Sequence, residues 1–185
     1  MTLLLSEMRR ALHRRSVWVL VAISVAGCAL AGVASFLSSA GESLAELQVD
    51  GDTHPALMHG WWRPGTGDGA LLIALLFLLL GTFFGGATAA GAEWRAGTVT
   101  TVLTWEPRRT RLHLTRTAAC GLLALPITFA LQALFLAAFL PSVLAHGSTG
   151  GVDGAWWLAL LGAMLRLSLL AALSGGLLGF AAGLA

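Results

Sequence analysis

The side chains of this sequence that could do chemistry are few and widely separated. Asp50, Asp52, His54 and His59 are the densest group of potential metal ligands. Their order differs from that of an EF-hand loop, which needs glycine at its sixth position, and both histidines lie in a proline-containing stretch. Inside the apolar runs we find no His/Cys/Asp cluster, Ser/His pair or paired carboxylates. We therefore expect no catalytic residue, no metal site and no cofactor bound by this chain, and we expect that it is not an enzyme.

Arginine is concentrated in one polar interval, Gly91 to Thr117, which reads GAEWRAGTVTTVLTWEPRRTRLHLTRT. Near-continuous apolar sequence flanks it on both sides. It holds five of the arginines: Arg95, Arg108, Arg109, Arg111 and Arg116. Such a segment either binds a soluble partner or only sets topology and contacts anionic lipid, and the composition alone favours the second interpretation.

The elements around this interval are apolar and long. The chain is 57% hydrophobic and 11% charged, where soluble domains have roughly 25% charged residues. About 20 apolar residues cross ~30 Å of hydrocarbon as a helix. Four runs are long enough: 16–40, 69–92, 118–140 and 155–185. Because runs without alternation favour helices over barrel strands, we predict an all-α, polytopic transmembrane helical bundle with four spans.

The positions of the arginines predict the orientation of these spans. Arg9, Arg10, Arg14 and Arg15 precede the first span and five more lie between the second and third, whereas intervals 41–68 and 141–154 hold only Arg63. By the positive-inside rule, the N-terminus and the interval 93–117 are cytoplasmic. The intervals 41–68 and 141–154 are then extracytoplasmic loops, the first with a short helix around Glu42 to Gln48.

Residues 1–15 have the pattern of an amphipathic helix lying in the membrane interface. Leu4, Leu5, Met8, Ala11 and Leu12 share one side at 100° per residue. A cleaved signal peptide ending at Ser38-Ser39-Ala40 is the alternative. The apolar stretch of about 24 residues favours an uncleaved span, because signal peptides have roughly 7 to 15.

Several residues within the runs predict helix packing. The small residues Gly81 and Gly85, and Gly175, Gly179 and Gly183, recur at the four-residue spacing that lets helices approach closely. Gln132 is expected to pack against a neighbouring helix. Cys28 and Cys120 are expected to be free thiols, because their depths along the spans differ too much for a disulfide.

Tryptophan pairs and a proline mark the outer ends of the spans. Trp61-Trp62 and Trp156-Trp157 have the positions of aromatic anchors at the outer interface. Pro141 is expected to close the third span.

Arg166 is the one charged residue deep in a predicted span. It lies about 17 Å along a helix from Ala155. An arginine at a helix centre costs roughly 2.5–3.5 kcal/mol to insert. It either faces a cavity or partner within the membrane, or an interfacial segment from Ala155 to Leu165 sets it closer to a headgroup. No lysine or arginine follows Arg166 to mark the end of this span. We therefore expect a sequence that is incomplete at its C-terminus.

The polar interval also predicts a short helix. Thr98 follows Gly97 as an N-cap, Val99, Val102 and Leu103 fall on one face, and Pro107 ends the helix by biasing Glu106 away from the α conformation. Two turns are not stable alone in water. The helix therefore needs a surface to dock on.

The order Glu93-x-x-x-Gly97-Thr98, Leu103, Pro107 and Arg111 resembles the loop between the second and third spans of type-2 ABC exporter permeases. The resemblance extends to the basic N-terminus, the acidic loop and the third span, and so covers essentially the whole chain. It departs at the C-terminal end, because members of that family usually have six spans and four are visible here.

The resemblance implies a short cytoplasmic coupling helix that binds an ABC ATPase subunit. Glu93 would fix the loop against the membrane domain. The apolar contact would come from Val99, Val102, Leu103 and Trp105, around Gly97, Thr98 and Pro107, and charge pairing from Arg108, Arg109 and Arg111. No G-x-x-x-x-G-K-[ST] phosphate loop occurs in the sequence, so ATP and Mg²⁺ are expected in the partner.

The function that this resemblance implies is that of a permease subunit of an ATP-driven exporter in a bacterial cytoplasmic membrane. It would pair with a second copy or a homologue, contact the lipid bilayer and bind no nucleic acid. The alternative is a non-transporting membrane anchor or assembly protein that recruits a cytoplasmic partner through the same basic loop.

Overall fold

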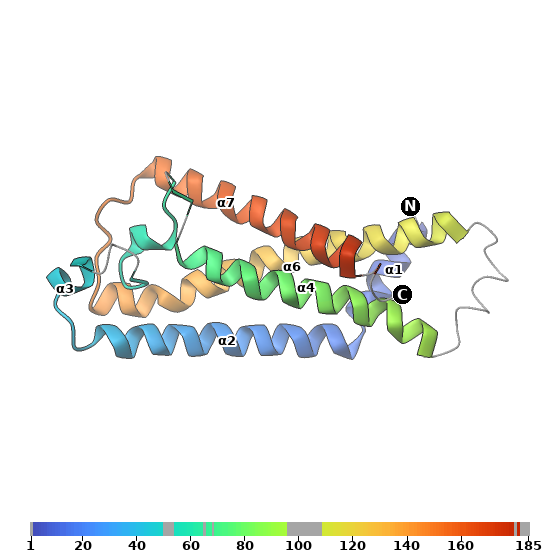
Figure 1. Ribbon diagram of the computed structural model, residues 1–185, viewed down its shortest axis with the longest axis horizontal. Coiled ribbons are helices and arrows are strands. Elements are labelled where there is room, and N and C mark those ends of the chain that lie inside the picture. The colour runs from blue at the N-terminus through green and yellow to red at the C-terminus, as the bar shows by residue number, and fades with distance from the viewer. Residues whose placement is uncertain are drawn as a thin grey trace. The chain divides into compact units, whose positions relative to one another are not determined.

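The computed structural model describes residues 2–49, 54–64, 66–67, 69–95, 109–179 and 181. The α-helices of these residues, labelled in Figure 1, are α1 (Thr2–Leu12), α2 (Arg15–Ser39), α3 (Leu44–Val49), α4 (Ala70–Arg95), α6 (Arg109–Ala145) and α7 (Gly154–Leu173). A 3₁₀ turn, η1 (Met58–Trp61), and a π-helix, η2 (Ser174–Gly179), complete the regular structure. Within these described ranges the only β-type pairing is an isolated bridge between Leu57 and Ser148. The predicted all-α class is confirmed.

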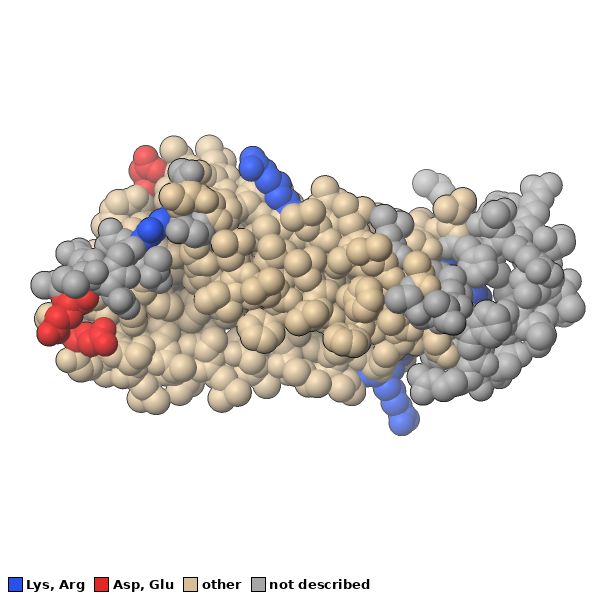
Figure 2. All heavy atoms as spheres, in the orientation of Figure 1, with Lys and Arg blue, Asp and Glu red and all other residues tan. Residues whose placement is uncertain are grey.

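Four of these helices are long and apolar enough to cross a membrane. Their apolar segments are Arg15–Ser39, Ala70–Gly91, Leu114–Ala145 and Gly154–Leu173, with mean hydropathy values of 2.3, 2.4, 2.2 and 1.8. Large apolar side chains such as Leu30, Phe77 and Leu158 are about 70% exposed. Figure 2 shows few charged side chains on the visible described surface. A surface of this kind fits lipid, and the chain is a multi-pass membrane protein.

Two helix boundaries differ from those that the apolar runs indicated. α6 includes Pro141 and continues to Ala145, so Pro141 does not close the third span as predicted. Proline is tolerated in membrane helices because local adjustments and neighbouring groups satisfy the backbone that it frees. The fourth run was expected to be one span from 155 to 185, but α7 ends at Leu173 and winds on as the π-helix η2.

The chain divides into two compact units. Unit 1 comprises Met1–Val21, Phe77–Thr128 and Ser168–Ala185, and unit 2 comprises Ala22–Leu76 and Phe129–Leu167.

Unit 2 has an apolar core that includes Trp61 and Trp156, one residue of each tryptophan pair. Trp61 and Trp156 are 2% and 6% exposed. Their indole N–H groups donate to the carbonyls of Pro55 at 2.8 Å and Trp62 at 3.0 Å. Both rings therefore pack inside the protein and not against lipid headgroups, as large aromatic side chains with a satisfied N–H can. Trp157 is 44% exposed and Trp62 is half-buried.

Close contact between α2 and α6 in unit 2 depends on Gly32. A Cβ placed there would meet the carbonyl oxygen of Ala138, and it would lie 2.9 Å from the Ala138 Cβ. One turn earlier, the thiol of Cys28 lies 4.0 Å from the carbonyl oxygen of Leu131. The two helices are in backbone contact here, as small residues permit in a membrane.

Helix contacts in unit 1 use some of the glycines that the sequence singled out. A Cβ at Gly175 would lie 2.7 Å from Thr82, and one at Gly179 would meet the carbonyl oxygen of Phe83. A Cβ at Gly85 would meet only the end of a leucine side chain at 3.5 Å, and a Cβ at Gly81 would meet nothing within 4 Å. The predicted packing face is confirmed for Gly175 and Gly179, Gly81 has no such contact among the described residues, and Gly183 lies outside them. Cys28 and Cys120 are free thiols, as predicted.

The short helix expected near Glu42 to Gln48 is α3, and a capping box starts it. The Ser43 N–H and hydroxyl donate to Glu46 Oε2 at 2.7 and 2.8 Å, and the Glu46 N–H points back to the Ser43 hydroxyl at 3.4 Å. The backbone N–H of Ser43, and then its hydroxyl, lower the pKa of Glu46 from its ordinary value.

We expect Gly32→Ala to lower the thermal midpoint of the detergent-solubilised protein by the equivalent of about 1–3 kcal/mol, since the new methyl overpacks against α6. Gly27→Ala, on the same helix, is the matched control because its Cβ meets nothing within 4 Å. Equal losses for both variants would contradict the contact through Gly32.

We expect α3 to lose order as the pH falls through the lowered pKa of Glu46. A carboxylate whose folded pKa is depressed stabilises above its unfolded pKa, and that contribution disappears on protonation. The measurement is the ¹³C shift of Leu47 between neutral and acidic pH. Glu46→Gln should remove the pH dependence, whereas Glu42→Gln, an exposed acid next to Ser43, should leave it intact.

Candidate partner-binding site

Helix α1 forms as predicted, with residues 2–12 helical. Leu4, Met8 and Ala11 are half-buried on one side, whereas Leu5 is 59% exposed although the pattern placed it with them. The ring N–H of Trp18 donates to the carbonyl of Leu12 at 2.8 Å, which satisfies a carbonyl at the C-terminal end of the helix. The turn from α1 into α2 is thus fixed by a side chain of α2.

Arg14, at that turn, ties the N-terminal segment to α4. Its Nη1 donates to the carbonyl oxygen of Ala89 at 2.7 Å. A cationic donor on a carbonyl at this distance is a strong hydrogen bond. Ala89 lies two turns before the end of α4 at Arg95, so the contact holds the helix close to the start of the basic segment.

Arg116, near the start of α6, is directed inward to α1. It is 7% exposed, and its Nε lies 3.7 Å from Glu7 Oε1. This separation is an ion pair and too long for a hydrogen bond. One of the five arginines of the polar interval therefore neutralises a carboxylate within unit 1 and is not available to a soluble partner.

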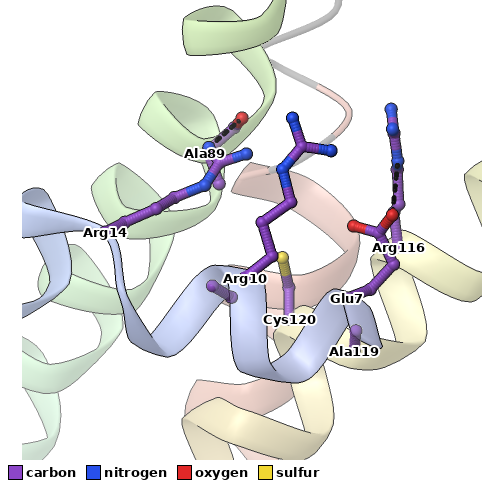
Figure 3. A pocket seen from close by; sticks show the side chains of 8 residues that line it. Glu7, Arg10, Arg14, Ala89, Arg116, Ala119 and Cys120 are labelled. Atoms are coloured by element: carbon purple, nitrogen blue, oxygen red, sulfur yellow. Dashed lines mark hydrogen bonds and ion pairs between the residues drawn. The ribbon is translucent and has the colours of Figure 1, made fainter. Parts of the chain in front are cut away.

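A small pocket lies between these two contacts. Figure 3 shows Arg14 directed toward Ala89 and Glu7 toward Arg116, with Arg10 and Cys120 drawn between them. The lining residues are Glu7, Arg10, Ala11, Arg14, Ala89, Arg116, Ala119 and Cys120. Its one carboxylate is paired with an arginine, so the lining supplies no acid–base couple. The geometry indicates a joint that holds α1 against α4 and α6.

Most of the predicted coupling residues lie outside the described residues. These are Gly97, Thr98, Val99, Val102, Leu103, Trp105, Pro107 and Arg108. Glu93 lies in α4, and Arg109 and Arg111 lie in the first turn of α6, with only their backbones described. The predicted short helix from Thr98 therefore stays a prediction.

The helices around that segment extend further than the apolar pattern indicated. The loop was expected to cover 93–117, but α4 continues to Arg95 and α6 already begins at Arg109. Polar residues continue a helix once an apolar stretch has started it, because each added residue gains a backbone hydrogen bond. Both ends of the segment 96–108 are therefore carried on membrane helices.

Unit 2 contains a polar cluster that the sequence reasoning missed. Ser39 Oγ lies 2.9 Å from Ser142 Oγ and 3.2 Å from His146 Nδ1. Ser35 Oγ donates to Ser142 Oγ at 3.2 Å, and Ser142 Oγ donates to the carbonyl oxygen of Ser35 at the same distance. Ser39 and Ser142 are fully buried. His146 lies just beyond the third apolar run, so this contact does not contradict the statement that the runs themselves hold no Ser/His pair.

This cluster joins α2 to α6. The ring nitrogen of His146 accepts a hydrogen bond from Ser39 or donates one to it, depending on the tautomer. Because Ser39 and Ser142 are fully buried, the contacts hold the two helices together. The signal was present in the sequence as four-residue spacing, Ser35 to Ser39 and Ser142 to His146, which places each pair on one helix face.

The two remaining candidates from the sequence also have definite positions. Arg166 is exposed on α7, so it does not face an interior cavity of unit 2. His54 Nδ1 accepts from the N–H of Ala56 at 3.2 Å, and its Nε2 lies 3.5 Å from Ser38 Oγ. Among the residues whose placement is described, no three of His, Cys, Asp and Glu gather as metal ligands. Asp50 and Asp52 lie outside them.

Comparison with models of protein families, with curated proteins and with solved structures finds no match.

We expect Glu7→Ala to destabilise the protein by about 1–3 kcal/mol, because it leaves the buried guanidinium of Arg116 without its carboxylate. The double variant Glu7→Leu with Arg116→Met should recover most of this loss, because replacing both members of a buried pair with apolar groups is often neutral. Thermal unfolding in detergent measures both. A double variant that is less stable than the sum of the single changes would contradict the pairing.

Proposed function

We propose that this chain is a membrane-spanning permease subunit of an ATP-driven ABC exporter. In this proposal a separate cytoplasmic ATPase binds the segment 96–108 and drives substrate movement across a bacterial cytoplasmic membrane. The pattern from Glu93 to Arg111 suggests the function, and the four long apolar helices are consistent with it.

The observation that supports the proposal best is the tie between α1, α4 and α6 next to the basic segment. Arg14 bonds to the backbone of α4, and Glu7 pairs with Arg116 of α6. The segment 96–108 leaves α4 and returns to α6 within the same unit. A partner that pulls on it acts on helices already fastened to each other, so its closure is transmitted as a rigid-body motion.

The residue types of the segment fit a groove on a soluble protein. Val99, Val102, Leu103 and Trp105 supply apolar contact, and Arg108, Arg109 and Arg111 supply positive charge for acidic groups on the ATPase. Glu93 holds the segment against the membrane domain. ATP and Mg²⁺ bind the partner, and a second permease copy or a homologue completes the transporter.

The test is purification of the tagged protein from its native membranes, with ATP hydrolysis and partner identity as readouts. We expect a co-purified subunit with a G-x-x-x-x-G-K-[ST] motif and ATPase activity in the same fraction. Val102→Asp with Leu103→Asp should reduce both more than tenfold, since charge in an apolar contact is costly. Thr101→Asp is the matched control, because position 101 lies on the opposite side of the expected helix.

Two outcomes contradict the proposal. Recovery of a partner without ATPase activity, still dependent on Val102 and Leu103, would favour the membrane anchor. Labelling of Thr110→Cys only from outside the cell would place the segment on the wrong side of the membrane. This labelling requires a background with Cys28→Ala and Cys120→Ala, because both thiols are free.

A further inference from the structure

We propose that the exposed side of α7 binds a membrane-spanning helix from outside this sequence, and that this helix carries an aspartate or glutamate facing Arg166. The proposal rests on α7 and does not depend on the exporter function.

The two sides of α7 differ sharply within unit 2. Leu160, Ala163, Met164 and Leu167 are all less than 10% exposed. On the other side Leu158, Leu161 and Leu165 are 73%, 45% and 55% exposed, and Arg166 is exposed among them. A single guanidinium thus stands in an apolar surface that this unit leaves uncovered.

The position of Arg166 along the helix puts the charge in hydrocarbon. It is the thirteenth residue of α7, which runs from Gly154 to Leu173. At 1.5 Å per residue it lies about 18 Å from the first residue and about 10 Å from the last. The helix spans about the thickness of the apolar layer, ~30 Å. Arginines at such depth pair with another group or face a wet cavity.

The carboxylate that would pair with Arg166 is not present in the spans of this chain. The nine acidic residues are Glu7, Glu42, Glu46, Asp50, Asp52, Asp68, Glu93, Glu106 and Asp153. None lies within the four apolar segments Arg15–Ser39, Ala70–Gly91, Leu114–Ala145 and Gly154–Leu173. A second copy therefore offers no acid at this depth, and charge complementarity requires a different helix.

Gly162 provides the second feature of the surface. It lies one turn before Arg166, and a Cβ built there would meet nothing within 4 Å. At 100° per residue it shares the exposed side with Leu158 and Leu165. An uncovered glycine lets another helix approach closely. The backbone of the partner would pack over Gly162, with its carboxylate beside Arg166.

The test uses a designed probe and the complete chain. A labelled 22-residue leucine/alanine helix with one central aspartate is reconstituted with the labelled protein in neutral phosphatidylcholine vesicles, and association is measured by energy transfer. An otherwise identical helix with a central leucine gives the baseline. We expect the aspartate helix to associate roughly 5- to 30-fold more tightly, the range of interhelical polar contacts in membranes.

Variants of α7 assign the effect to its residues. Arg166→Leu should abolish the preference for aspartate, and its thermal unfolding in detergent is the separate measurement that shows that the variant folds. Arg166→Asp should transfer the preference to a helix with a central arginine. Leu158→Ala is the control on the same side and should retain the preference for aspartate.

Equal association of the aspartate and leucine helices with the unaltered protein would overturn the proposal. So would an aspartate preference that survives Arg166→Leu. A parallel measurement adds phosphatidylglycerol to the vesicles. Binding of this lipid that depends on Arg166, without any preference among the helices, would identify a lipid headgroup as the occupant and would equally overturn the proposal.

Discussion

The structure depends on one constraint: a backbone in hydrocarbon must satisfy its own hydrogen bonds. Helices meet this constraint along their whole length, so the four apolar segments have no choice of secondary structure. Burial of apolar side chains cannot then drive these helices together, because lipid is equally apolar. What remains is close approach and a few polar contacts, and the structure uses both. Gly32 brings α2 against α6, and the serine and histidine cluster joins the same two helices.

Each unit contains both charged and neutral polar contacts. In unit 1, Arg14 donates to a carbonyl of α4, Glu7 lies beside Arg116, and the hydroxyls of Thr82 and Ser174 lie 3.0 Å apart. In unit 2 the contacts come from hydroxyls, a ring nitrogen and indole N–H groups, and the carboxylates of Glu46 and Asp153 accept from backbone N–H groups. A buried polar group costs free energy unless it has a partner, and these contacts supply one.

Features that depend on long apolar runs or on the spacing of side chains were predictable from the sequence. Four apolar runs of sufficient length had to be helices, and α1 and α3 were recognisable from side-chain period and local position. The ends of the helices were harder to predict. Proline usually ends a helix, but Pro141 lies within α6, where neighbouring groups allow the helix to continue. Partner choice was not predictable. Arg116 is the same residue type as its arginine neighbours in the polar interval, yet this side chain pairs with a glutamate more than a hundred residues away in the chain.

Residues of unit 2 show the same limit of prediction from sequence. Trp61 and Trp156 have the sequence positions of interfacial residues, but each ring has a carbonyl within reach and lies in the core. The cluster around Ser39 was overlooked because serine is common and only its spacing carries information. The periodicity of a sequence does not predict which segments far apart in the chain lie next to each other in the structure.

The π-helix at Ser174–Gly179 sets the facing of its own residues relative to those of α7. A π turn accommodates one residue more than the α-helical repeat, and that residue shifts the angular phase of the chain by about 100°. Gly175 and Gly179 face α4 in this wider winding. With α-helical winding over the same residues, Gly179 would be rotated relative to Gly175 by a different angle. The π winding that follows α7 therefore allows both glycines to meet the backbone of α4.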